Sequence, residues 1–242
     1  TSTGNPEIGC TCEVCTSKDS RDWRLRASAF VEIDGKHLLI DCGPDFRLQM
    51  LTHSITRLDG VLVTHEHYDH VGGLDDLRPF CRDKGVDIYA EDNVAEAIIT
   101  RMPYAFREFK YPGVPNLELI RISEQPFDAA GIKVIPIRIL HGKLPILGYR
   151  IGNFAYLTDL KYISDDEIMK LRGLDVLVID ALRKGHHPSH EGLEEALQNI
   201  EKIRPKTAYL IHMSHRIGLH EFIEKELPAN VHYAYDGLTI TC

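Results

Sequence analysis

The sequence predicts an α/β protein in which two mixed β-sheets pack face to face and helices cover them on the outside. Three observations predict this fold class. Short β-branched runs alternate with helical stretches, and turn dipeptides typical of β-hairpins, Asp34-Gly35 and Gly152-Asn153, join two pairs of those runs. Several runs also end on a histidine or an aspartate. Because hairpins need antiparallel strands, one fully parallel sheet does not explain the pattern.

The first half of the chain predicts a hairpin, followed by a strand that leads into a histidine-rich segment. The β-branched run 60–64 stops where the histidines begin, and Gly72-Gly73 separate them from the next helical pattern. The histidine-rich segment is therefore expected on a strand-to-helix loop. The expected elements of this half are strands at 27–33, 36–41, 60–64 and 87–90 and helices at 74–82 and 93–102.

The second half repeats the pattern of strands that end on polar residues. A strand at 132–140 ends at His141, and a strand at 207–211 delivers His212. Asp159 comes just past the second strand of a hairpin. The other expected elements are hairpin strands at 147–151 and 154–158, a strand at 176–180, a helix from Ser164 with Glu167 in a capping box, and a helix at 191–203.

Composition and charge narrow the class of protein. With 242 residues, 43% of them hydrophobic, the chain can bury a full core, and we expect one domain over residues 1–242. No apolar run approaches the roughly eighteen residues that span a bilayer, so no membrane partner is expected. A net charge of -8 gives no basic field for a nucleic-acid backbone, which disfavours extended nucleic acid as a partner. Six cysteines are too few for a disulfide scaffold, so we expect a reducing, cytoplasmic location.

The densest polar motif is the run Thr64-His65-Glu66-His67-Tyr68-Asp69-His70. His65 and His67 lie two residues apart and point the same way from an extended segment, while Asp69 and His70 follow as the chain turns. Imidazole nitrogens and a carboxylate suit zinc, iron, manganese or nickel, and a catalytic site keeps open positions for water. A polar loop with incidental histidines is the alternative interpretation. Further donors at separate strand ends argue against it.

This H-x-H-x-D-H pattern resembles the signature of the metallo-β-lactamase fold superfamily. The resemblance implies an αββα sandwich with two divalent ions, zinc, manganese or iron, in its active site. It implies that one ion is held by His65, His67 and His141, the other by Asp69, His70 and His212, and that Asp159 bridges them.

Asp41, in the run Leu-Ile-Asp-Cys-Gly, looks like the family's aspartate that orients the metal-binding loop. An ordinary strand-end turn residue is an equally good interpretation of Asp41 on sequence grounds. In such a centre, two ions about 3.5 to 4 Å apart lower the pKa of a shared water and make hydroxide at neutral pH.

A second motif, Cys10-Thr11-Cys12-Glu13-Val14-Cys15, lies within the expected N-terminal loop at residues 1–16. Three thiols can bind zinc as thiolates, and His215, three residues beyond His212, is the expected fourth ligand of a structural zinc. Together with the H-x-x-H spacing, this cluster resembles the PhnP-type phosphodiesterases of bacterial carbon-phosphorus lyase pathways. The resemblance leaves a homodimer open. PhnP-type chains carry an apolar β-strand before the Gly-rich turn at residues 4–9, where this sequence begins.

A third group of histidines lies at residues 184–191, where a helix start favours an anion. Resemblance to PhnP-type and transfer-RNA-processing phosphodiesterases implies that His190 contacts the phosphate and protonates the leaving oxygen. His186 and His187 fit solvated loop positions better.

The sequence therefore predicts a dinuclear phosphodiesterase with Asp69 and His190 as its catalytic residues. Its expected substrate is a small or cyclic phosphodiester, such as 5-phosphoribosyl 1,2-cyclic phosphate, attacked by metal-bridged hydroxide. Two alternatives stay open. The same ions can promote hydrolysis of a thioester or lactone, and a non-catalytic, metal-dependent binding or cofactor-handling protein can have the same fold.

Overall fold

The computed structural model describes residues 1–82, 84–109 and 111–242. The backbone divides into two compact units, which we call the terminal unit (Thr1–Ala27 with Ile135–Cys242) and the central unit (Ser28–Val134). Each has its own apolar core. The prediction of one domain over residues 1–242 stays a prediction.

The central unit contains a five-stranded sheet in the order β1-β2-β3-β4-β5. The predicted hairpin is confirmed, because Ile33 pairs with Lys36 and the two turn residues Asp34 and Gly35 have φ of 50° and 71°, as a tight turn of left-handed residues requires. The other pairs in this sheet are parallel. The strands are β1 (Ala29–Ile33), β2 (Lys36–Ile40), β3 (Gly60–Leu62), β4 (Val86–Glu91) and β5 (Leu117–Ile122).

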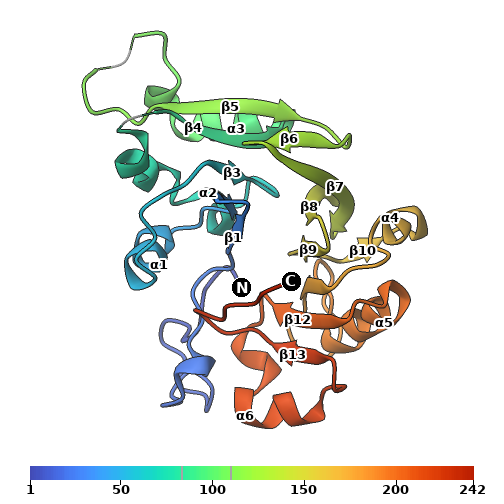
Figure 1. Cartoon of the computed structure of the whole chain (residues 1–242). Helices are drawn as coiled ribbons and strands as arrows, with labels where there is room; N and C mark the ends of the chain where they lie inside the picture. Colours follow the sequence, from blue (N-terminus) through green and yellow to red (C-terminus); the bar gives the residue numbers. More distant parts are fainter. Residues whose placement is uncertain (83, 110) are drawn as a thin grey trace. The chain divides into compact units, whose positions relative to one another are not determined.

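Helices of the central unit follow its parallel strands. Helix α3 packs against β4 and β5, which are drawn in green in Figure 1. The helix expected at 74–82 is a 3-10 helix instead, and Pro79 inside it supplies no N–H for an α-helical bond. The helices are α1 (Phe46–Thr52), α2 (Tyr68–Val71), η2 (Leu74–Cys81), α3 (Asp92–Arg101) and η3 (Pro103–Ala105).

The second sheet has the order β10-β7-β8-β9-β11-β12-β13, with β6 paired to the start of β7. The boundary between the units falls inside β7, so β6 belongs to the central unit. Strands β9, β11, β12 and β13 are parallel neighbours. The strands are β6 (Phe127–Ala129), β7 (Ile132–His141), β8 (Leu144–Ile151), β9 (Phe154–Leu157), β10 (Tyr162–Ile163), β11 (Val176–Asp180), β12 (Thr207–Ile211) and β13 (Val231–Tyr233).

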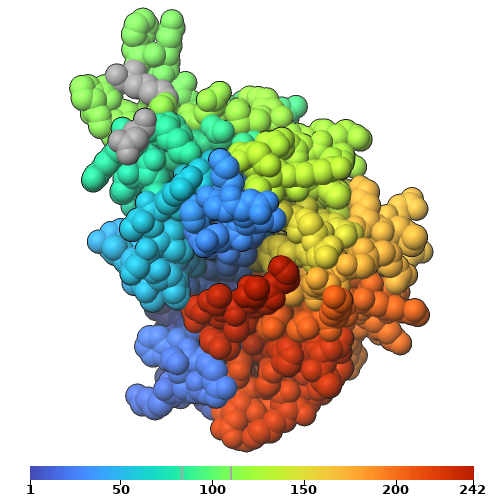
Figure 2. Space-filling view, in the orientation of Figure 1, coloured from blue at the N-terminus to red at the C-terminus, as the bar shows by residue number. Residues whose placement is uncertain are grey.

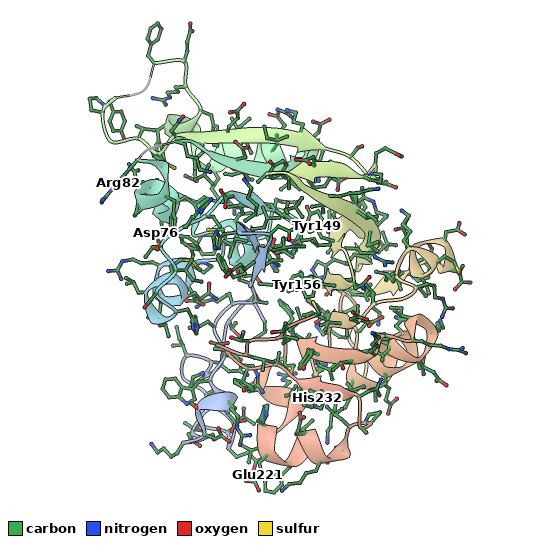
Figure 3. All side chains as sticks on the ribbon, in the orientation of Figure 1. Asp76, Arg82, Tyr149, Tyr156, Glu221 and His232 are labelled. Atoms are coloured by element: carbon green, nitrogen blue, oxygen red, sulfur yellow. The ribbon has the colours of Figure 1, made fainter. Side chains whose placement is uncertain are left out.

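The second predicted hairpin is also confirmed. Ile151 pairs with Phe154 across the turn at Gly152, whose φ is 57°. Tyr149 and Tyr156, both labelled in Figure 3, are cross-strand partners on β8 and β9 and are fully buried. The buried pair therefore packs on the two strands that lead the chain to Asp159.

Helices of the terminal unit begin close to the predicted capping residues. The Ser164 side chain accepts a hydrogen bond from the Glu167 N–H at 3.3 Å, and α5 begins at Leu193 rather than at Glu191. Helix α5 packs against β11, and α6 lies next to β13 (Figure 1). The helices are η1 (Ser20–Asp22), α4 (Asp165–Lys170), α5 (Leu193–Ile203), η4 (His215–Ile217), α6 (His220–Ile223) and η5 (Glu224–Glu226). Among the described residues, no helix combines the length and the apolar character that crossing a membrane requires.

Candidate functional site

In the central unit, the histidine-rich run leaves β3 in an extended conformation and then enters α2. His67 caps α2 with φ of -62° and ψ of 147°, so the following Asp69 and His70 lie in its single turn. The side chains of His65 and His67 converge, and their Nε2 and Nδ1 atoms are 3.0 Å apart. Two nitrogen ligands of a tetrahedral ion with bonds of about 2.0–2.1 Å lie about 3.3 Å apart. The pair therefore has the spacing of neighbouring ligands on one ion.

Asp41 holds the same run from the end of β2. Its carboxylate accepts bonds from the Thr64 backbone N–H at 2.9 Å and from His70 Nδ1 at 2.6 Å. Burial raises the pKa of Asp41, and the His70 and Thr64 contacts oppose that shift. With Nδ1 donating to Asp41, the lone pair of His70 is on Nε2, which lies 3.3 Å from an Asp69 oxygen. A cation between these two acceptors would satisfy both.

The terminal unit gathers the other predicted donors. His141, Asp159 and His190 each offer an atom within 4.8 Å of the other two. His212 joins them, with its Nε2 atom 3.5 Å from an Asp159 oxygen. His141 Nδ1 donates to the Ser189 carbonyl oxygen at 2.8 Å, so the lone pair of His141 is also on Nε2.

Asp180, at the end of β11, is a site residue that the sequence reasoning missed. Its carboxylate accepts from His190 Nδ1 at 2.9 Å and so orients that ring, and its other oxygen lies 3.6 Å from His212 Nδ1. Burial raises the pKa of the neighbouring Glu191 to about 9, and repulsion from Asp180 adds to that shift. At neutral pH Glu191 therefore adds no second negative charge. The sequence feature that could have identified Asp180 is its place at the end of a buried strand, similar to the place of Asp159 just past β9.

Three of these residues have a left-handed backbone. Asp41, Asp159 and His212 have φ of 63°, 54° and 58°, and each follows a β-strand. Such a conformation costs a non-glycine residue about 1 kcal/mol or more. Backbone strain at three donor-type residues is typical of positions set by function.

The structure thus assembles the predicted residues as two groups, one in each unit. The central unit brings together His65, His67, Asp69 and His70 with Asp41, and the terminal unit brings together His141, Asp159 and His212 with His190. That the two groups serve one pair of ions stays a prediction.

The cysteine motif forms a second donor cluster within the terminal unit. His215 Nδ1 lies 3.1, 3.4 and 3.3 Å from the sulfur atoms of Cys10, Cys12 and Cys15. Sulfur and nitrogen ligands of a tetrahedral zinc lie about 3.5 Å apart when the bonds are about 2.3 and 2.0–2.1 Å long. Glu7 adds support, because one of its carboxylate oxygens is 3.5 Å from His215 Nε2. Three thiols and one imidazole at these spacings fit a structural zinc site.

The thiols of this cluster differ in acidity. A hydrogen bond from the Cys15 backbone lowers the pKa of Cys12 to about 7, against the opposing effect of burial. Burial raises the pKa of Cys15 to about 11. Cys12 is therefore more readily available as thiolate near neutral pH than Cys15, which makes it a good position to test.

Comparison with known proteins gives one family match and several relatives. Residues 36–213 match the model of the beta-lactamase superfamily domain. The crystal structure of a new diphosphatase from the PhnP family has a TM-score of 0.93 and 39% sequence identity, and the match covers 100% of this chain and 94% of that one.

Two other relatives are named for different activities. The octanoyltransferase of Porphyromonas gingivalis (strain ATCC BAA-308 / W83) is 49% identical over 241 residues, which are 98% of this chain and 49% of that protein. This chain therefore spans about half the length of that relative. The exodeoxyribonuclease WalJ of Streptococcus pneumoniae is 27% identical over 246 residues, covering 89% of this chain and 86% of the relative.

Replacing Asp41 by Asn should weaken metal binding in the histidine-rich run. The amide accepts a weaker bond from His70 Nδ1 and no longer fixes the tautomer, so metal affinity should fall about 10- to 100-fold. The change in metal affinity is measured by calorimetric titration of each variant with the metal ion. Asp34→Asn, in the exposed β1–β2 turn of the same unit, is the matched control, and equal affinities in the two variants would contradict the role of Asp41.

Replacing Cys12 by Ser should release about one zinc per chain and lower the midpoint of thermal unfolding, because a hydroxyl is a poor zinc ligand. Metal analysis and calorimetry check both results. Cys242→Ser, at an exposed position, should change neither. Unchanged zinc content in the Cys12 variant would eliminate the structural site.

Proposed function

Because the chain belongs to the beta-lactamase superfamily and, within it, to the PhnP family, we propose that it hydrolyses a small or cyclic phosphodiester. Membership supports a metal-dependent hydrolase, and the predicted metallo-β-lactamase fold of two mixed sheets flanked by helices is confirmed. Family membership alone does not select a phosphodiester as the substrate. This choice is supported by the diphosphatase and exodeoxyribonuclease relatives, which both act on phosphate esters or anhydrides.

We propose that the donors of the two units hold two divalent ions, zinc, manganese or iron. His65, His67 and His141 would hold one ion and Asp69, His70 and His212 the other, with Asp159 available to both. Two bound ions would supply Lewis acidity and lower the pKa of a water molecule. The support for this assignment is the donor chemistry of each group together with the ordered motif.

The observation that carries the phosphodiester proposal is the bond from His190 to Asp180. Asp180 fixes the imidazole with Nδ1 as the donor, and its carboxylate stabilises positive charge on the ring when Nε2 carries a second proton. The His190 ring packs between those of His141 and His212, with centroid distances of 4.5 and 4.9 Å. A protonated His190 in this position can bind a phosphate oxygen and give its proton to the leaving oxygen.

Acyl hydrolysis is the second candidate, because one relative is an octanoyltransferase. The same pair of ions can polarise a thioester or lactone carbonyl. This chain spans only about half of that relative, so the acyl chemistry can belong to the other half. A phosphodiester is negatively charged before it reacts, whereas a thioester or lactone is neutral, so a protonated His190 would favour the first candidate.

A substrate panel on enzyme loaded with zinc, manganese or iron tests the proposal. It contains bis-p-nitrophenyl phosphate, 5-phosphoribosyl 1,2-cyclic phosphate, 2′,3′-cyclic nucleotides, an octanoyl thioester and a lactone. Turnover of at least one phosphodiester, with kcat/KM well above that for the acyl substrates, supports it. Turnover of the acyl substrates alone would replace it with the second candidate, and sedimentation of the same samples tests whether the protein is a homodimer.

Replacing His190 by Ala should lower phosphodiester turnover about 10²- to 10⁴-fold while the metal content is kept. The loss should be larger for a ribosyl or alkyl leaving group than for p-nitrophenolate, because p-nitrophenolate leaves without a proton. His186 is an exposed histidine of the same loop, so His186→Ala is the control and should keep the wild-type turnover rate. Equal losses for both leaving groups would limit His190 to binding phosphate, and a near-normal rate would remove it from the mechanism.

A further inference from the structure

The loop at residues 184–190 of the terminal unit places a second histidine, His187, beside His190. The two ring centroids are 5.2 Å apart, and the ring planes are tilted by 52°. A solvated position was expected for His187, but the residue is half-buried, whereas its neighbour His186 is exposed. Helix α5, which follows this loop, lies at the surface of the terminal unit and is drawn in orange in Figure 2. Solvation therefore does not explain the position of His187.

Contacts with the end of β7 and the turn after it hold this part of the loop. The Ser189 carbonyl oxygen accepts from His141 Nδ1 at 2.8 Å and from the Gly142 N–H at 3.1 Å. Gly142 has φ of 60°, and a Cβ atom there would lie 3.2 Å from Ser189 Cβ, so the loop packs closely against the turn. Pro188 also restricts the backbone of the preceding His187 to extended conformations. His187 is therefore held in place by its neighbours.

The hydrogen bonds of His187 fix its tautomer. Its Nδ1 atom lies 3.3 Å from both the backbone nitrogen and the side-chain oxygen of Ser189. A backbone N–H can only donate, so Nδ1 accepts and the ring proton is on Nε2. Burial lowers the pKa of His187, and repulsion from His190 and Arg183 lowers it further, so the ring is neutral at pH 7.

The Nε2 proton of His187 is available to a ligand. It has no acceptor within residues 1–82, 84–109 and 111–242, and the half-buried ring leaves this atom in contact with solvent. With N–H···O bonds of about 2.9 Å, donors on two rings whose centroids are 5.2 Å apart can reach two oxygens of one phosphate group. A fixed, neutral donor therefore lies beside His190 at a spacing that suits a shared phosphate.

We propose that His187 binds substrate by donating a hydrogen bond from Nε2 to a non-bridging oxygen of the phosphate whose leaving oxygen is protonated by His190. This assignment rests on the proposed phosphodiesterase function. Non-bridging oxygens carry the negative charge of a phosphodiester, so they are its strongest hydrogen-bond acceptors. The contact forms when the substrate binds and persists in the transition state. His187 therefore serves substrate binding, whereas His190 serves proton transfer.

Three substitutions of His187 test this role in the metal-loaded enzyme, with bis-p-nitrophenyl phosphate as substrate. His187→Ala should raise KM about 10- to 100-fold and leave kcat nearly unchanged, because a contact made equally in the ground state and the transition state is lost. His187→Gln keeps an N–H donor at the reach of Nε2 and should restore KM to within about threefold. His187→Asn keeps an acceptor for Ser189 but has no donor at that reach, so it should resemble His187→Ala. The reverse order of the Gln and Asn variants would limit His187 to holding the loop and would overturn the proposal.

Calorimetric titration of the metal-loaded enzyme with inorganic phosphate tests the same contact without turnover. The Kd for phosphate should rise about 10- to 100-fold in His187→Ala. It should not change in His186→Ala, the matched control at an exposed position of the same loop. If the wild type turns over no phosphodiester, the proposed function fails, and this titration still decides the role of His187. No measurable phosphate binding at about 10 mM, or equal Kd values in the wild type and His187→Ala, would overturn that role.

Discussion

The left-handed backbone at the strand ends is the constraint on which the candidate site depends. Asp41, Asp159 and His212 each follow a β-strand with positive φ, and the strands before them are held by ladder hydrogen bonds. Glycine would adopt this conformation without strain, but it would supply neither the proposed metal donors of Asp159 and His212 nor the Asp41 carboxylate that holds His70. The chain therefore accepts about 1 kcal/mol or more of strain at each position. In return the backbone, rather than a flexible side-chain rotamer, sets the direction of each donor.

A second layer of contacts then fixes the histidine rings. His70 donates to Asp41, His190 to Asp180 and His141 to the Ser189 carbonyl oxygen, in each case through Nδ1. All three rings consequently present Nε2 as the reactive nitrogen. The acceptors differ in charge, because two are carboxylates and one is a neutral carbonyl. A carboxylate partner stabilises positive charge on a ring more than a carbonyl does, which suits His70 to holding a metal ion and His190 to proton transfer.

The sequence predicted the parts of this site that depend on local spacing. The H-x-H-x-D-H run, the cysteine motif and the two hairpins follow from residue types at fixed offsets, and the structure has each cluster or turn as expected. The role of Asp180 was not predicted because it depends on β11 lying parallel to β9 and β12, a long-range pairing without a local sequence signature. Strands β10 and β13 were not predicted because two or three residues are too few to show an alternating hydrophobic pattern. The 3-10 helix around Pro79 was mistaken for an α-helix because the apolar spacing outweighed one proline.

The loop after β12 links the two donor clusters of the terminal unit. His212 belongs to the cluster with Asp159, and His215, three residues later, belongs to the cysteines. Between them Ser214 donates to the Leu182 carbonyl oxygen through both its N–H, at 2.8 Å, and its hydroxyl, at 3.0 Å. A segment so short and so anchored cannot move one histidine without moving the other. A zinc held by the cysteines would therefore favour the position of His212 that binds an active-site ion, and by linkage that ion would favour the zinc to the same degree. Through the geometry of His212, the N-terminal loop would then contribute to the proposed reaction, although none of its own side chains is among the proposed active-site ligands.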